Sequence, residues 1–92
     1  MLSLADELPR LANEHHLTTR AIANAAGVSE GHLSRVRAKR KPASADLAER
    51  VARVFQLPPE YFVEVRLMRV VDAVHADPEL RDRIFRQLQS SG

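Results

Sequence analysis

Apolar residues recur at helical spacing along the whole of this 92-residue chain, and no stretch alternates apolar and polar residues long enough to form a strand. A first helix is expected to begin after Ser3 or Asp6, either of which can cap it, and to end near residues 15–16. Pro9 favours the later start, because proline is tolerated in the first turn of a helix but not deeper inside it.

Capping residues predict two short helices in the next segment of the chain. Thr18 or Thr19 is expected to cap the second helix, and Gly27 is expected to close it in the left-handed conformation. Ser29 then caps a third helix, and the run of residues 39–43 breaks the helical pattern. The second and third helices are therefore joined by a very short turn.

Three more helices are predicted in the second half of the chain. Ser44 caps the fourth helix, and the two prolines at positions 58–59 end it and start a fifth, over about residues 60–76. Asp77 and Pro78 suit an N-cap and a first helical position, so they are expected to open a sixth helix. The fold class that these patterns predict is all-α.

Residues 19–38 have the residue types that two tightly crossing helices require. Ala23 is small, so the second helix can approach the third closely, and Gly27 lies where the chain must turn. The apolar positions that complete the pattern are Ile22, Ala26, Val28, Leu33 and Val36. This combination predicts a helix-turn-helix, in which the second helix of the pair enters the major groove of DNA.

Four segments of the chain resemble the lambda-repressor-like (Cro/repressor, or XRE) helix-turn-helix family. They are Leu17 to Ala23, Ala26 to Ser29, His32 to Val36 and Leu57 to Phe62. The resemblance implies a five-helix DNA-binding domain, placed here in residues 1–62, which acts as a dimer on a near-palindromic operator. Residues 63–92 lie outside the resemblance and are expected to form a C-terminal helical dimerisation extension.

Two residues depart from the pattern of that family. Members often have an acidic residue where Arg37 stands and a glycine where Lys39 stands. The end of the third helix is therefore expected to have a different shape and to be more basic toward DNA.

The basic residues are concentrated in one quarter of the chain. Residues 19–41 contain six Lys or Arg residues and one acid, a net charge of +5, while residues 1–18 carry −2 and residues 42–92 carry −1. A local excess of positive charge beside near-neutral flanks is typical of a surface that binds a polyanion. A solvated charged face is the alternative interpretation.

The outer face of the third helix is expected to contact DNA bases, because Leu33 and Val36 turn the opposite face into the core. The candidate base contacts are Ser29, Glu30, Gly31, Ser34 and Arg35. Arg35 is the strongest of them, since a guanidinium can form two hydrogen bonds with a guanine. A phosphate contact or a solvated side chain is the alternative for Arg35, and a helix-dipole role is the alternative for Glu30.

Phosphate contacts are expected at the edges of the helix pair and in the loop that follows it. The candidates are Thr19, His32, Arg37, Lys39, Arg40, Lys41 and Ser44. Thr19 can offer its hydroxyl together with backbone N–H groups at the start of the second helix. Ser44 has a second interpretation as a helix cap that does not touch DNA.

The last two helices carry more apolar residues than a small monomer is expected to leave exposed. The candidate residues for a homodimer interface are Val63, Leu67, Val70, Val71, Val74, Leu80, Ile84, Phe85 and Leu88. Packing across a two-fold axis would bury them and would set the spacing of two recognition helices. The alternative is that the sixth helix folds back over its own domain and covers the apolar stripe.

Composition and motifs argue against several other kinds of protein. The chain has no cysteine, so disulfides and thiolate metal sites are excluded. No apolar run reaches the roughly 20 residues of a membrane span, and the N-terminus lacks the features of a signal peptide. No catalytic framework, phosphate-binding glycine loop or histidine pair at metal-binding spacing is present, so neither an enzyme nor a cofactor or metal site is expected.

Together these features predict a sequence-specific DNA-binding regulator of transcription, a repressor in its expected form, which acts as a homodimer at the nucleoid in a bacterial cytoplasm. One alternative is an antitoxin-like or adaptor protein that binds another protein through its C-terminal helices. RNA binding is a weaker alternative, because none of the four aromatic residues lies in the basic segment.

Overall fold

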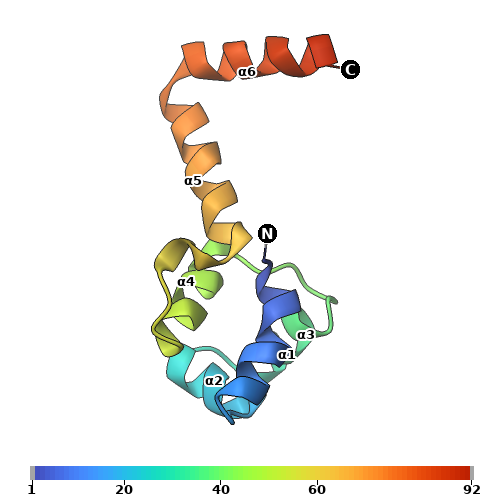
Figure 1. Ribbon diagram of the computed structural model, residues 1–92, viewed down its shortest axis with the longest axis vertical. Coiled ribbons are helices and arrows are strands. Elements are labelled where there is room, and N and C mark those ends of the chain that lie inside the picture. Colours follow the sequence, from blue (N-terminus) through green and yellow to red (C-terminus); the bar gives the residue numbers. More distant parts are fainter. Residues whose placement is uncertain (1, 92) are drawn as a thin grey trace.

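The helices form a helical domain, residues 2–65, from which an arm, residues 66–91, projects (Figure 1). The computed structural model describes residues 2–91, and all regular structure in that range is helical. The elements are α1 (Leu4–Glu14), α2 (Thr19–Ala26), α3 (Glu30–Arg37), α4 (Ala45–Val54), the 3-10 helix η1 (Pro59–Tyr61), α5 (Val63–Ala76) and α6 (Pro78–Ser91). The all-α fold class is therefore confirmed.

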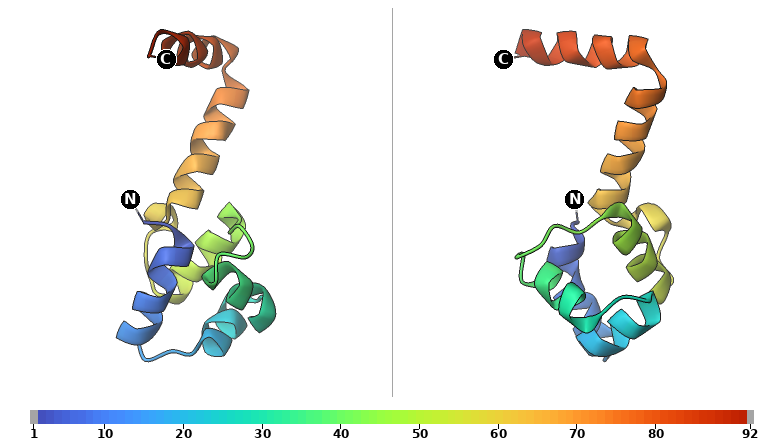
Figure 2. Two further views of the ribbon diagram at one scale, coloured as in Figure 1. Left: turned by 90° about the vertical axis from the view of Figure 1, so that its right-hand side faces the viewer. Right: turned by 180° about the vertical axis from the view of Figure 1, so that it is seen from behind.

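One apolar core holds the helical domain together. Figure 2 shows α1 to α4 grouped around it, with α5 leaving the group at one end. The larger side chains that are fully buried there are Leu4, Leu8, Ile22, Leu33, Val36, Val51, Phe62 and Val65. Val65 belongs to the first turns of α5, so the core extends beyond residue 62.

The first helix begins earlier than the position of Pro9 predicted. Ser3 caps α1 by accepting a hydrogen bond from the backbone N–H of Asp6 at 3.1 Å, and Pro9 lies inside the helix. The early start buries Leu4 completely and lets its N–H donate to the Glu64 carboxylate at 2.8 Å. These tertiary contacts offset the intrahelical hydrogen bond that a proline cannot make.

The other expected caps are confirmed. Thr18, Ser29 and Ser44 each accept a hydrogen bond from the backbone N–H three residues later, at 3.0 to 3.1 Å. Asp77 accepts from the N–H groups of Glu79 and Leu80, both at 3.1 Å, and so opens α6. Local side-chain chemistry therefore determines where these helices begin.

Each of α1 to α4 ends in a backbone hydrogen bond that reaches back five residues and satisfies a carbonyl of the last turns. In α3, for example, the N–H of Arg40 donates to the carbonyl of Arg35 at 2.9 Å. The residues that take the left-handed conformation at these turns are His16, Gly27, Lys39 and Gln56. Lys39, at φ +61°, thus follows the backbone path that a glycine would take, and the different shape expected for this helix end is not observed.

The sequence predicted one continuous fifth helix from about residue 60, but the structure breaks it into two elements. The short helix η1 is followed by Phe62 in an extended conformation, with φ −88° and ψ 144°, and α5 starts only at Val63. This break directs the Phe62 ring into the core, where it is completely buried and meets Tyr61 edge to face at 5.1 Å between ring centroids. Burial of a large aromatic ring therefore outweighs helix continuity here.

A polar cluster joins α1 to η1 at the edge of the core. Glu7 is only 7% exposed, and its carboxylate accepts hydrogen bonds from Arg10 Nε at 3.0 Å and from the Tyr61 hydroxyl at 2.7 Å. These hydrogen bonds lower the pKa of Glu7, and the one from Arg10 has the larger effect. The same carboxylate raises the pKa of Tyr61. Because each group is satisfied by another, the cluster ties the two elements together at little desolvation cost.

The Glu7 cluster makes the stability of the fold depend on pH. A lowered pKa in the folded state means that Glu7 contributes stability above about pH 4.5, its ordinary pKa, and loses that contribution as pH falls through its folded value. We expect Glu7→Gln to lower the free energy of unfolding at pH 7 by about 1–3 kcal/mol and to reduce the loss of stability below pH 4.5. Urea unfolding between pH 7 and pH 3 measures both, with Glu79→Gln as the exposed control. Parallel pH profiles for wild type and Glu7→Gln would contradict the assignment.

The left-handed helix ends predict opposite effects for two substitutions. A residue with a Cβ costs about 1–2 kcal/mol in this conformation, so we expect Gln56→Gly to raise the free energy of unfolding by about 0.5–1 kcal/mol. Gly27→Ala should lower it by about 1–2 kcal/mol, since an added Cβ would also lie 3.2 Å from Arg50 Nη1. Thermal unfolding of both variants tests the pair, and equal signs would be inconsistent with the backbone described here.

Candidate nucleic-acid interface

Helices α2 and α3 are held at a fixed angle by their shared core and by the short turn between them. Gly27 begins that turn with φ +74°, and Ser29 ends it as the cap of α3. Leu33 and Val36 of α3 are completely buried, as is Ala23 of α2. Because one face of α3 is anchored in this way, its opposite face is turned to solvent.

The five expected base contacts lie together on the solvent face of α3 and its cap, and all of them are exposed: Ser29, Glu30, Gly31, Ser34 and Arg35. The hydroxyl oxygen of Ser29 is already used as the cap, where it accepts from the N–H of His32. A Cβ on Gly31 would lie 3.8 Å from Arg35 Nη1, so the arginine side chain extends back over the glycine. Among residues 2–91, the Arg35 side chain has neither an ion-pair nor a hydrogen-bond partner, which leaves its guanidinium available to a ligand.

The first group of expected phosphate contacts surrounds the start of α2. Arg37 Nη1 donates to the Thr19 hydroxyl at 2.8 Å, and both residues line a cleft of about 320 Å³ together with Asn13 and His16. The Thr18 hydroxyl accepts a hydrogen bond from the N–H of Ala21. The other N–H groups in the first turn of an α-helix have no partner within the helix. A guanidinium, a hydroxyl and the first residues of a helix thus line one cleft, and these are elements from which anion sites are built.

The second group of expected phosphate contacts lies in the loop after α3. Lys41 Nζ is 3.1 Å from His32 Nδ1, while Arg40 is exposed. Lys39 forms an ion pair with Asp6 at 2.6 Å and so lowers the pKa of that carboxyl. Because the Lys39 ammonium is already paired with a carboxylate of the same chain, Lys39 is a weaker candidate for a phosphate contact than Arg40 or Lys41.

Ser44 is exposed and acts as the cap of α4, accepting from the N–H of Leu47 at 3.1 Å. This geometry satisfies the capping interpretation of Ser44. A contact to phosphate would use the hydroxyl proton, which the cap leaves free.

The residues expected at the dimer interface lie on α5 and α6, which extend from the helical domain (Figure 1). Exposed among them are Leu67, Val70, Val71, Phe85 and Leu88. Half-buried are Val63, Val74, Leu80 and Ile84. Helix α6 does not fold back over the helical domain, so the alternative in which it covers its own domain is wrong (Figures 1 and 2).

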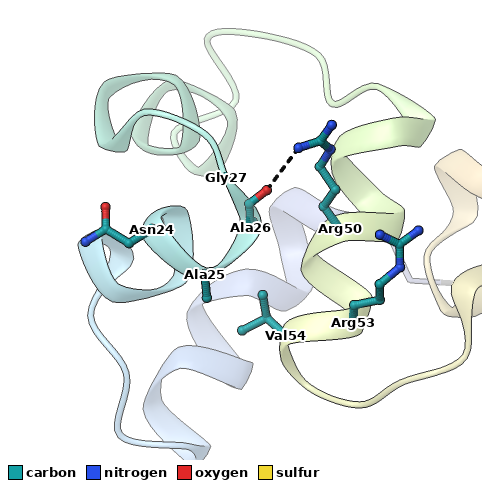
Figure 3. A pocket seen from close by; sticks show the side chains of 7 residues that line it. All are labelled: Asn24, Ala25, Ala26, Gly27, Arg50, Arg53 and Val54. Carbon is teal, nitrogen blue, oxygen red and sulfur yellow. Dashed lines mark hydrogen bonds between the residues drawn. The ribbon is translucent and has the colours of Figure 1, made fainter.

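A cleft between the end of α2 and α4 was not anticipated from the sequence (Figure 3). Arg50 Nη1 donates to the Ala26 carbonyl at 3.4 Å, and its Nε pairs with Asp46 at 2.9 Å. The cleft measures about 470 Å³, and Arg53 lies beside it. Arg50 thus supports the end of α2 next to the turn, a role that only the approach of α4 reveals.

Two further features concern other kinds of ligand. Within the described residues 2–91, no three His, Asp or Glu side chains are grouped so that they could hold a metal ion. No helix in the same part of the chain is both long and apolar enough to cross a membrane.

Comparisons of the chain with protein families, with curated proteins and with solved structures found no match. The α2–α3 surface combines exposed guanidinium groups, hydroxyl groups and helix N–H groups, which are groups that bind phosphate.

Proposed function

We propose that the protein is a sequence-specific DNA-binding regulator of transcription, built as a lambda-repressor-like helix-turn-helix of which α2 and α3 form the two helices. The observation that carries the proposal is the solvent face of α3. This face presents the unpaired side chain of Arg35. All six cations of residues 19–41, the segment that contains α3, are exposed.

The exposed face of α3 suits the major groove of DNA. An α-helix with its side chains is about 10–12 Å across, and the major groove is about 12 Å wide. The small residues at its start, Ser29 and Gly31, allow the backbone to come close to the base edges. Arg35, one turn further along, can then form two hydrogen bonds with a guanine.

The expected phosphate contacts orient this helix in the groove. The cleft of Thr19 and Arg37 offers one site at the start of α2, and the loop cations Arg40 and Lys41 offer another. Contacts of this kind determine position and orientation, while the base contacts determine sequence preference. Their arrangement around α3 is what a complex with duplex DNA needs.

In this proposal the protein acts as a homodimer on a near-palindromic operator and represses transcription by occupying it. Two recognition helices read successive major grooves when they lie about 34 Å apart. The expected place of action is the nucleoid in a bacterial cytoplasm. An antitoxin-like or adaptor role is the second candidate, favoured by the exposed apolar residues of the arm, such as Leu67 and Phe85.

Binding to DNA should be selective and sensitive to salt. We expect selection from random duplexes at physiological salt to enrich a near-palindromic motif. The affinity for that motif should fall linearly, on logarithmic scales, as salt increases. Arg37→Ala should lower the slope of this dependence by about one, whereas Arg53→Ala on α4 should leave it unchanged. Failure to enrich any motif would favour the second candidate.

Two arginine variants should separate base reading from phosphate binding. Arg35→Ala should reduce the preference for the operator over random DNA by about tenfold to a hundredfold, because the paired hydrogen bonds to guanine are lost. Arg40→Ala should weaken binding to both DNAs by similar factors. Titration of each variant with operator and random duplexes measures this, and equal losses on the two DNAs for Arg35→Ala would reassign it to the backbone.

A further inference from the structure

The arm is apolar, yet nothing in the described chain covers it. None of its residues, 66 to 91, is buried. Leu67 is 63% exposed, Phe85 is 60% exposed and Leu88 is 66% exposed. Exposed apolar surface on this scale marks a site of association.

The exposed apolar side chains form two patches on either side of a corner. At the corner itself, Val74, Leu80 and Ile84 are half-buried, where α5 and α6 meet. The base patch lies on α5 and consists of Leu67, Met68, Val70 and Val71. The tip patch lies on α6 and consists of Phe85 and Leu88.

The corner keeps the two patches of one chain apart. Asp77 has an extended backbone, with φ −133° and ψ 92°, and its carboxylate caps α6 through Glu79 and Leu80. Helix α6 therefore starts in a new direction and leads sideways from the end of α5 (Figures 1 and 2). The tip patch cannot reach the base patch of its own chain while this corner persists.

We propose that a second copy of the chain covers both patches, with the tip patch of each copy packed on the base patch of the other across a two-fold axis. At about 1.5 Å per helical residue, the base patch lies about 9–15 Å from Asp77 and the tip patch about 12–17 Å from it. Because the base patch and the tip patch lie at similar distances from Asp77, the tip patch of each copy can contact the base patch of the other at the same time.

A groove beside the base patch offers a seat for a side chain of the second copy. It measures about 230 Å³ and lies between the start of α4 and α5. Its walls are mainly apolar and include Ala43, Ala45, Leu67, Met68 and Val71. An aromatic ring such as that of Phe85 in the second copy suits such a groove.

The size and the charge of the arm both fit self-association. A stable interface usually involves about 20–30 residues on each side, which is the size of an arm that spans residues 66–91. Helices α5 and α6 together carry five arginines and four acids, and Asp77 between them adds a fifth acid, so residues 63–91 have a net charge of zero. Two copies of this segment therefore have no net charge repulsion to overcome.

This interlocked dimer deepens the proposed function, since it would determine the distance between the two α3 helices on an operator. Only that consequence rests on DNA binding. The association itself is measured as a mass, so a failure of the dimer and a failure of DNA binding are seen in different experiments.

Sedimentation equilibrium of the full chain at micromolar concentration is the first test. We expect a dimer for wild type and at least a hundredfold weaker association for Leu67→Glu and for Phe85→Glu, with unchanged helical circular dichroism. Ser90→Glu adds the same charge to α6 away from its apolar face and should remain dimeric. A monomeric wild type would overturn the proposal and leave the arm to a different protein.

Disulfide trapping is the second test. Because the chain has no native cysteine, only the introduced cysteines can form a cross-link. Single-cysteine copies with Val71→Cys are mixed with copies carrying Phe85→Cys or Leu88→Cys and then oxidised. We expect a covalent pair that contains one copy of each kind. A dimeric mass without this cross-link would overturn the interlocked arrangement. So would a double variant, Val71→Cys with Phe85→Cys, that closes its disulfide only within one chain.

Discussion

The burial of Leu33 and Val36 is the interaction on which the rest of the structure depends. Both side chains are completely buried in the core shared by α1 to α4, and together they fix the rotation of α3 about its axis. Arg35 lies between them in the sequence and therefore faces solvent. Removing one large core side chain costs about 2–5 kcal/mol, against a total stability of about 5–15 kcal/mol for a domain. The same packing thus maintains the fold and presents the surface proposed to bind DNA.

Tight helix ends make this packing possible in so short a domain. The left-handed residues His16, Lys39 and Gln56 each carry backbone strain that a glycine would avoid. In return, each turn satisfies carbonyl groups at the end of a helix and brings the next residue inward. Leu17 and Leu57, which directly follow two of these turns, pack against the core. The strain is small beside the apolar burial that it permits.

The helical domain and the arm differ in how their surfaces are satisfied. In the domain, buried polar groups such as Glu7 have partners, and no buried side-chain nitrogen or oxygen of the described residues lacks a hydrogen bond. In the arm, apolar side chains such as Leu67 and Leu88 remain in water. The domain buries its apolar side chains within the single chain, whereas the arm leaves many of its own exposed. The face proposed to bind DNA is on α2 and α3, whereas the apolar side chains proposed to pack on a second copy are on α5 and α6.

The sequence by itself determined where most helices start and how α2 ends, because caps such as Ser29 and the left-handed Gly27 act over three or four residues. It also indicated which residues α3 exposes, since helical spacing alone decides that. Only the tertiary structure decided the early start of α1 despite Pro9, the break at Phe62 and the contact of Arg50 with the end of α2. Each of these depends on burial or on partners far away in the chain, whose free energy outweighs the local preference that a sequence pattern records.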